Sequence, residues 1–167
     1  MFKHILVPLD GSKLAEAAIP AAASLAQTLE APVTLLHIIE QDAPQEIHRD
    51  HHLTQADEAA AYLKNVAERG FPPGVDVTRH VHTAAVKDVP GSIAEHATRE
   101  FQPDLIVMCT HGKSGVRELL YGSIAQQVVA QGLTPLLLIK PRTDTSTSFR
   151  LYKILVPLDT GPTHDAS

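Results

Sequence analysis

Short apolar runs alternate with longer alanine-rich amphipathic runs over residues 1–140, and this alternation constrains the fold more than any other feature. Short apolar runs bounded by turn residues predict buried strands, and the amphipathic runs predict helices. We expect strands at His4–Leu9, at Val33–Ile39, around Val75, Val77 and Val81, at Asp104–Cys109 and at Pro135–Ile139. We expect helices at Lys13–Leu29, Thr54–Arg69, Pro90–Glu100 and Ser123–Gln131. The resulting order, βαβαβαβαβ, predicts an α/β fold: a five-stranded parallel sheet with helices on both faces.

Pro20 lies inside the first expected helix, Lys13–Leu29. A proline within a helix removes a backbone hydrogen bond and kinks the helix. Because the pattern of alanine and leucine continues through the proline, we predict one kinked helix. Two shorter helices are the alternative.

The third expected strand has polar residues at alternate positions, which is typical of a strand at the edge of a sheet. His80 and His82 share one face of this strand because side chains repeat every second residue. We interpret both histidines as surface residues.

The composition suits a parallel sheet covered on both faces, since 44% of residues are hydrophobic but only 4% are aromatic. A net charge of −5 argues against binding to nucleic acid or to an anionic membrane. A single cysteine, Cys109, excludes an internal disulfide and fits a reducing compartment. The N-terminal apolar run ends at Pro8, too early for a signal peptide, and no later run has the length of a membrane span. We therefore expect a cytoplasmic protein.

One six-residue sequence, Ile-Leu-Val-Pro-Leu-Asp, occurs at residues 5–10 and again at 154–159. The spacing is the length of one domain of this kind, which indicates that a second copy of the domain begins here. We expect a domain at 1–140, a linker rich in Thr and Ser at 141–150, and the start of a truncated second repeat, one strand, at 151–167.

A glycine-containing segment, residues 109–123, follows the fourth strand and leads into a helix. Gly112 and Gly115 permit positive φ and close approach of a ligand, and Gly122-Ser123 presents backbone N–H groups at a helix N-terminus. Lys113 adds a positive charge. Such a segment can bind phosphate; the alternative is a tight turn followed by a helix that Ser123 caps.

Five sequence blocks resemble the universal stress protein family over about residues 1–140. These are Ile-Leu-Val-Pro-Leu-Asp-Gly-Ser at 5–12, Leu-Leu-His-Ile at 35–38, Asp-Leu-Ile-Val-Met at 104–108, Thr-His-Gly-Lys-Ser-Gly at 110–115 and Leu-Leu-Tyr-Gly-Ser at 119–123. The resemblance implies a Rossmann-like fold of the adenine nucleotide alpha hydrolase type, and the repeat at 154–159 resembles the tandem arrangement common in that family.

ATP-binding members of the family carry the pattern Gly-x2-Gly-x9-Gly-Ser/Thr after the fourth strand. Gly112, Gly122 and Ser123 fit it, but Cys109 occupies the position of the first glycine. The resemblance places adenosine against residues 8–10, adenine against Ile38 and Met108, and phosphates on the glycine segment. The expected nucleotide-binding residues are Pro8, Leu9, Asp10, Ile38, Met108, Cys109, Gly112, Lys113, Gly115, Gly122, Ser123 and Ile124.

Several of these residues have a structural alternative. Ile38 and Met108 are apolar strand residues, which usually serve in core packing. Asp10 can bind a ribose hydroxyl or a metal ion near phosphates, but it can also stabilise the turn that follows its strand. The loop histidines His48, His51 and His52, with Asp50, allow a weak metal site, although a solvated loop is the preferred interpretation.

The expected function is that of a stress-response regulatory module that binds an adenine nucleotide, ATP or AMP, with Mg²⁺ accompanying ATP. We expect a homodimer with an unidentified protein partner. No general base is poised to activate water, so any ATP hydrolysis should be slow. The alternative is a dimerisation module of the same fold that no longer binds nucleotide, because Cys109 replaces the first glycine of the pattern.

Overall fold

A computed structural model describes residues 2–47, 50–110, 123–131, 134–141 and 149. Five parallel strands form its main sheet, in the spatial order β5-β2-β1-β6-β7. These strands are β1 (Ile5–Pro8), β2 (Val33–Glu40), β5 (Val77–Val86), β6 (Leu105–Cys109) and β7 (Leu136–Ile139). The predicted five-stranded parallel sheet is confirmed, and β5 lies at an edge as the sequence indicated.

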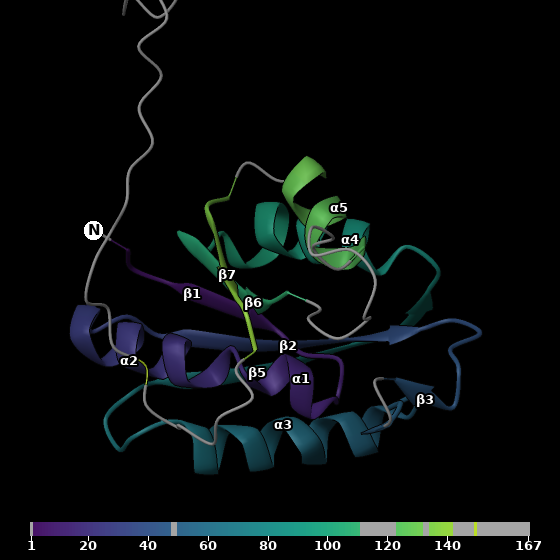
Figure 1. Cartoon of the computed structure of the whole chain (residues 1–167), viewed down its shortest axis with the longest axis horizontal. Helices are drawn as coiled ribbons and strands as arrows, with labels where there is room; N and C mark the ends of the chain where they lie inside the picture. The colour runs from purple at the N-terminus through teal and green to yellow at the C-terminus, as the bar shows by residue number, and fades with distance from the viewer. Residues whose placement is uncertain (1, 48–49, 111–122, 132–133, 142–148, 150–167) are drawn as a thin grey trace, which may run out of the picture.

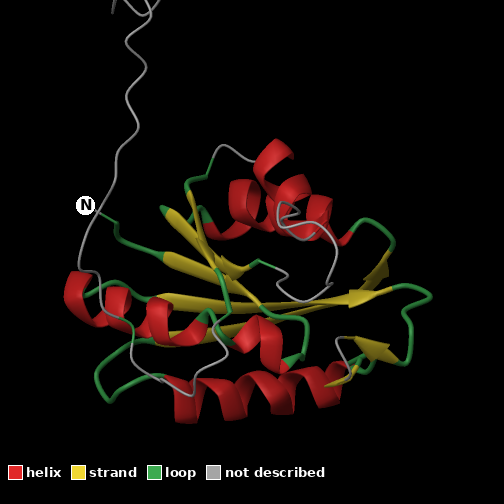
Figure 2. Cartoon of the chain, viewed as in Figure 1, coloured by secondary structure: helices red, strands yellow, loops and turns green. Residues whose placement is uncertain are grey.

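Helices cover both faces of the sheet (Figures 1 and 2). On one face lie α1 (Lys13–Glu16), α2 (Ile19–Leu29) and α3 (Ala56–Gly70). On the other lie α4 (Val89–Glu95), the π-helical turn η1 (His96–Phe101) that continues it, and α5 (Ser123–Gln131). Among the described residues, no helix is both long enough and apolar enough to span a membrane.

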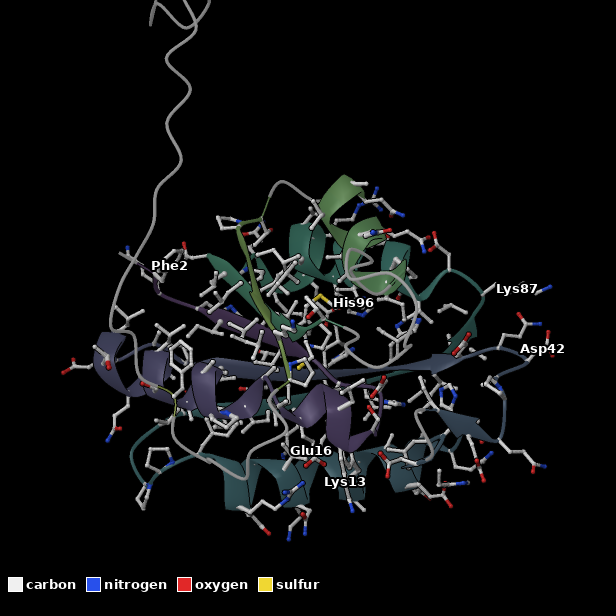
Figure 3. All side chains as sticks on the ribbon, in the orientation of Figure 1. Phe2, Lys13, Glu16, Asp42, Lys87 and His96 are labelled. Carbon is white, nitrogen blue, oxygen red and sulfur yellow. The ribbon has the colours of Figure 1, made fainter. Side chains whose placement is uncertain are left out.

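The central strand β1 shows how the sheet separates two hydrophobic cores. Ile5 and Val7 are fully buried on the side of α2 and α3, and Leu6 is fully buried on the side of α4 and α5. Side chains of a strand alternate between its faces, so an entirely apolar strand supplies both cores. Charged side chains such as Asp42 and Lys87 instead project from the loops that follow β2 and β5 (Figure 3).

The single kinked helix predicted over Lys13–Leu29 is wrong. The structure has two helices, and Pro20 is the second residue of α2 rather than an interior residue of a longer helix. The first N–H groups of a helix have no partner within the helix, so a proline costs little there. Ser12 caps α1 by accepting a hydrogen bond from the N–H of Ala15 at 3.1 Å.

Two other segments differ from the sequence prediction: one contains a hairpin, and one helix is less regular than expected. In the segment of the loop histidines, between β2 and α3, β3 (Glu46–Ile47) and β4 (Asp50–His51) form a small antiparallel hairpin. The helix expected at Pro90–Glu100 begins with Asp88 as its N-cap and changes to π-helical geometry at His96. Apart from Pro141 and Phe149, the expected linker and second repeat at 141–167 lie outside the described residues.

Candidate functional site

The strand order reverses between β1 and β6, and a pocket opens at the carboxyl ends of these two strands. From β1 the chain proceeds outward to β2 and β5, and then returns to the other side of β1 as β6 and β7. Such a reversal leaves a crevice because the connections on its two sides run over opposite faces of the sheet. About 690 Å³ of atom-free space lies in and in front of the pocket, open solvent at its mouth included.

The turn after β1 forms one wall of the pocket. Asp10 Oδ1 accepts hydrogen bonds from the backbone N–H of Ser12 at 2.9 Å and from its hydroxyl at 2.6 Å. Gly11 has a φ of +91°, and a Cβ there would lie 2.9 Å from the side chain of Leu53. Asp10 therefore stabilises the turn after its strand, as the structural alternative predicted, and it also lines the pocket.

Apolar side chains from the sheet and from the helices α4 and α5 form most of the pocket wall. Ile38 and Met108 lie at the ends of β2 and β6, and Ile93 and Ile124 come from α4 and α5. Ile38, Met108 and Ile93 also belong to the core cluster on this face of the sheet. Core packing and pocket lining are thus not exclusive for these residues, since the pocket is the open end of that core.

His37 connects the end of β1 to the segment that precedes α3. Its Nδ1 lies 2.8 Å from the carbonyl oxygen of Leu9, and its Nε2 lies 3.1 Å from that of Leu53. Burial holds the pKa of His37 below its usual value, although both carbonyls favour the protonated ring. A neutral ring donates to one of these carbonyl oxygens and a protonated ring to both, and His37 thereby links the end of β1 to the segment before α3.

His52 is the buried polar side chain of the pocket whose hydrogen bonding is incomplete. It is 3% exposed, and its Nδ1 has no hydrogen-bond partner among the described residues. Its Nε2 lies 3.6 Å from Glu40 Oε2, and both residues line the pocket. Buried polar atoms are nearly always hydrogen-bonded, so an unpaired ring nitrogen at a pocket wall points to a ligand or water. The preferred interpretation of this loop as solvated is wrong for His52, while His51 is exposed.

Cys109 ends β6 and lies at the pocket with 8% of its surface exposed. Burial, with a smaller contribution from the negative charge of Asp10, raises the pKa of Cys109 to about 12. The group is therefore a neutral thiol at physiological pH, and its sulfur occupies space in the pocket.

The structure brings together those expected site residues that belong to β1, β2, β6 and α5. Lining the pocket are Pro8, Leu9, Asp10, Ile38, Met108, Cys109 and Ile124. Ser123 is the first residue of α5. The remaining expected residues, Gly112, Lys113, Gly115 and Gly122, lie outside the described part of the chain.

Sequence reasoning missed the polar residues that reach the pocket from the β2 side. Glu40 is the charged last residue of an otherwise mostly apolar strand, a signal that could have marked a strand-end site. His52 carried no such signal, because it reaches the pocket only through the β3–β4 hairpin. The described lining combines apolar walls with a few polar atoms and contains no lysine or arginine, an arrangement that fits an uncharged planar group.

Comparison with known proteins gives a consistent result. The profile of the universal stress protein family matches residues 1–140. A universal stress protein of Methanocaldococcus jannaschii is 29% identical over 149 residues, covering 84% of this chain and 83% of that protein. The fold is similar to a universal stress protein in complex with cAMP (TM-score 0.60, 21% identity, 83% of this chain and 97% of the other). It is also similar to the universal stress protein from Archaeoglobus fulgidus in complex with dAMP (TM-score 0.56, 21% identity, 83% and 98%).

Proposed function

The chain belongs to the universal stress protein family, and we propose that its strand-end pocket binds an adenine nucleotide, ATP or AMP. The protein would act as a regulatory module whose nucleotide state changes the surface that it presents to a protein partner. The observation that carries the proposal is the pocket itself: an apolar slot at the reversal of strand order, lined also by a few polar side chains that include Asp10 and His52.

The pocket has the chemistry that an adenine ring and a ribose require. Ile38 and Met108 offer apolar surface to the faces of the base, and the His52 ring offers a polar atom to its edge or to a sugar hydroxyl. Asp10 stands at the end of β1, where a ribose hydroxyl or a Mg²⁺ ion bound to ATP would be within the reach of a carboxylate. Complexes of similar folds with cAMP and dAMP support the same ligand class.

Phosphate binding is proposed for the glycine segment. The N-terminus of α5 at Ser123 and the backbone around Gly112, Gly115 and Gly122 would donate N–H groups to phosphate oxygens. Lys113 would add a positive charge that the described pocket lining lacks.

The remaining features of the proposal concern assembly and location. We propose a cytoplasmic homodimer in which residues 1–140 form the domain, 141–150 a linker and 151–167 the start of a second copy. We expect at most slow ATP hydrolysis, in keeping with a regulatory rather than a catalytic role.

A dimerisation module that does not bind nucleotide is the second candidate function. Cys109 favours it, because a buried thiol lies where the family pattern has glycine. In that case the pocket would be closed to the triphosphate by the Cβ and sulfur of this residue.

Isothermal titration of the full chain with ATP, ADP and AMP, with and without Mg²⁺, tests the proposal. The preparation is first checked for co-purified nucleotide by denaturing it and analysing the released small molecules. Ser123→Asp is the informative variant, because a carboxylate suits a helix N-terminus but repels phosphate. Ser123→Thr is its matched control, since it retains the hydroxyl and adds no charge.

We expect saturable binding at one site in the wild type and in Ser123→Thr, and loss of at least tenfold in affinity in Ser123→Asp, about 1.4 kcal/mol. Absence of binding in a folded, ligand-free wild type would favour the dimerisation module. Equal affinity in both variants would place the nucleotide away from the N-terminus of α5.

A further inference from the structure

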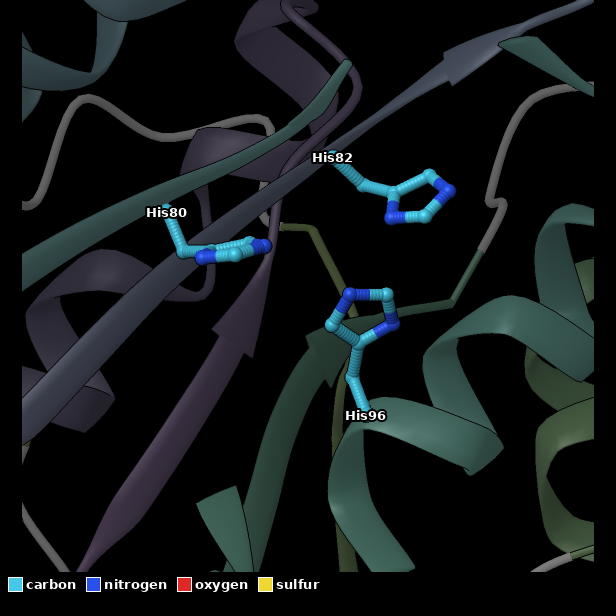
Figure 4. Close-up of side chains that lie close together, drawn as sticks. All are labelled: His80, His82 and His96. Carbon is cyan, nitrogen blue, oxygen red and sulfur yellow. The ribbon is translucent and has the colours of Figure 1, made fainter. Parts of the chain in front are cut away.

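Three histidines gather on the face of the sheet that carries α4, away from the wall of the nucleotide pocket. His80 and His82 extend from the same face of the edge strand β5, and His96 faces them from the start of η1 (Figure 4). The rings of His82 and His96 have centroids 4.9 Å apart, and those of His80 and His96 5.2 Å apart. The interpretation of His80 and His82 as simple surface residues is wrong, because both are half-buried in this cluster.

The donor atoms lie close enough together for small side-chain movements to bring them around one ion. Each histidine has a ring nitrogen within 4.8 Å of a nitrogen of each of the others. Glu100 adds a carboxylate: its Oε1 lies 3.6 Å from His80 Nδ1, and its Oε2 lies 3.4 Å from His96 Nε2. Both distances are long for hydrogen bonds. They are close to the ~3.3 Å between neighbouring ligands in a tetrahedron with bonds of 2.0–2.1 Å.

The surroundings of His96 prepare its ring for coordination. Its Nδ1 lies 2.7 Å from the carbonyl oxygen of Ser92, which can only accept a hydrogen bond. Nδ1 therefore donates this hydrogen bond, and Nε2 is the ring nitrogen that faces Glu100. A histidine that donates its other N–H to a carbonyl is the usual arrangement around a protein-bound metal ion.

His80 is half-buried among the other proposed ligands, with its Nδ1 directed at Glu100. Phe101 packs against the rings of His80 and His96 and gives the cluster an apolar wall.

We propose that His80, His82 and His96, with Glu100 as the fourth ligand, bind one divalent transition-metal ion, with Zn²⁺ as the preferred ion. Imidazole ligands select zinc and its neighbours over Mg²⁺ and Ca²⁺, which prefer oxygen. Four protein ligands leave no open position, as in structural zinc sites. The ion would join the edge strand β5 to the α4–η1 helical segment.

This site is independent of nucleotide binding, although the two are connected through shared elements. His80 and His82 lie beside Leu36 and Ile38 in the register of β5 with β2, and both of these residues line the pocket. Val89 and Ile93 of α4 line it as well. An ion that fixes α4 against β5 would therefore hold one wall of the pocket in place.

The test uses the full chain without a polyhistidine tag, stripped of metal with a chelator. Zn²⁺ is titrated by calorimetry, and Co²⁺ is added as a spectroscopic probe because four-coordinate cobalt absorbs visible light far more strongly than six-coordinate cobalt. We expect one Zn²⁺ per chain, intense cobalt bands that Zn²⁺ abolishes, and a rise in Tm of about 5–10 °C at 100-fold excess over Kd.

His82→Gln and Glu100→Gln are the informative variants, because these side chains are only partly buried or exposed and their loss should leave the fold intact. His51→Gln is the matched control, since His51 is an exposed histidine outside the cluster. We expect at least a tenfold loss of Zn²⁺ affinity in the first two variants, unchanged affinity in the control, and equal Tm values for all four proteins in the metal-free state to within about 3 °C.

Three results would overturn the proposal. The first is the absence of saturable Zn²⁺ binding to the folded, metal-free wild type. The second is Zn²⁺ binding of unchanged affinity in both His82→Gln and Glu100→Gln. The third is a weak cobalt spectrum typical of six-coordination.

Discussion

Cys109 is the residue on which the two candidate functions differ. It lies at the end of β6, beside Asp10 and Met108, and is almost fully buried against the pocket. Ile124 of α5 and Cys109 both line the pocket, so a nucleotide bound there would lie near the thiol. Because the thiol is neutral, its effect on a ligand is one of volume rather than charge.

Cys109→Gly should therefore increase the affinity for ATP. Removing the Cβ and sulfur relieves overpacking of about 1–3 kcal/mol, which corresponds to a five- to 150-fold lower Kd. Glycine within a strand costs about 0.5–1 kcal/mol of folding free energy relative to alanine, so Tm should fall slightly. Isothermal titration and thermal unfolding of the same samples measure both effects.

Cys109→Ala is the matched control for this prediction, because it retains the Cβ and removes the sulfur. If the affinity of Cys109→Ala lies between those of the wild type and Cys109→Gly, both the Cβ and the sulfur obstruct the nucleotide. If neither variant gains affinity, Cys109 does not obstruct the nucleotide, and the argument for the dimerisation module loses its basis.

The residues of the site differ in how far the sequence could predict them. Residues at the ends of β1 and β6, such as Asp10 and Met108, follow from the strand pattern and the family motif. His52 and the cluster of His80, His82 and His96 depend on contacts between segments distant in sequence. Such contacts are created by the register of the strands and the path of the hairpin, which no local pattern specifies.

At the level of elements, strands were predicted more accurately than helix boundaries. The buried strands are continuous apolar runs because both of their faces are covered, and this signal is strong. Helix boundaries instead depend on capping residues and prolines. A proline inside a kinked helix and a proline at the start of a new helix look alike in sequence. Pro20 illustrates this: the alanine pattern continues across it, yet the chain ends α1 before it and begins α2 at Ile19.

Pro20→Ala separates the two interpretations. At the second position of α2 the proline replaces an N–H that has no partner within the helix, and its ring restricts the unfolded chain. We expect alanine to lower the free energy of unfolding by about 0.4–1 kcal/mol. A proline inside a continuous helix would behave in the opposite way, and its removal would stabilise the protein by about 3 kcal/mol. Urea unfolding monitored by circular dichroism measures the difference.

Gln27→Pro provides the comparison, because Gln27 is an exposed residue beyond the first turn of α2, where the backbone N–H groups bond within the helix. We expect this change to cost about 3 kcal/mol or more through the lost hydrogen bond and the ring clash. A marked gain of stability in Pro20→Ala would show that the proline strains the helix after all.

For the whole molecule, the sheet has two different edges. The β5 edge is polar and carries His80 and His82. At the other edge, β7 consists of Leu136, Leu137, Leu138 and Ile139, all half-buried, and within the described residues it pairs with β6 alone. An apolar edge strand is a template for pairing with another chain. This asymmetry favours β7 as the contact of the proposed homodimer.

Leu138→Pro should separate the proposed dimer into monomers. Ile106 and Thr110 of the β6 segment donate to the carbonyl oxygens of Pro135 and Ile139, so these odd-numbered residues direct their backbone groups toward β6. Backbone groups alternate in direction along a strand, and those of Leu138 therefore face away from β6. A proline there removes a donor for a partner strand without removing a hydrogen bond to β6. Analytical ultracentrifugation over a range of concentrations measures the change.

Leu138→Ala is the matched control, because it loses the packing of the leucine side chain against the core but retains the N–H group. If dimers form through the backbone of β7, the alanine variant remains a dimer at concentrations where the proline variant is a monomer. Equal dissociation of both variants would mean that the leucine side chain, rather than the strand edge, holds the two copies together. A wild type that sediments as a monomer at every concentration would contradict the dimer itself, and would leave the nucleotide site to act within a single chain.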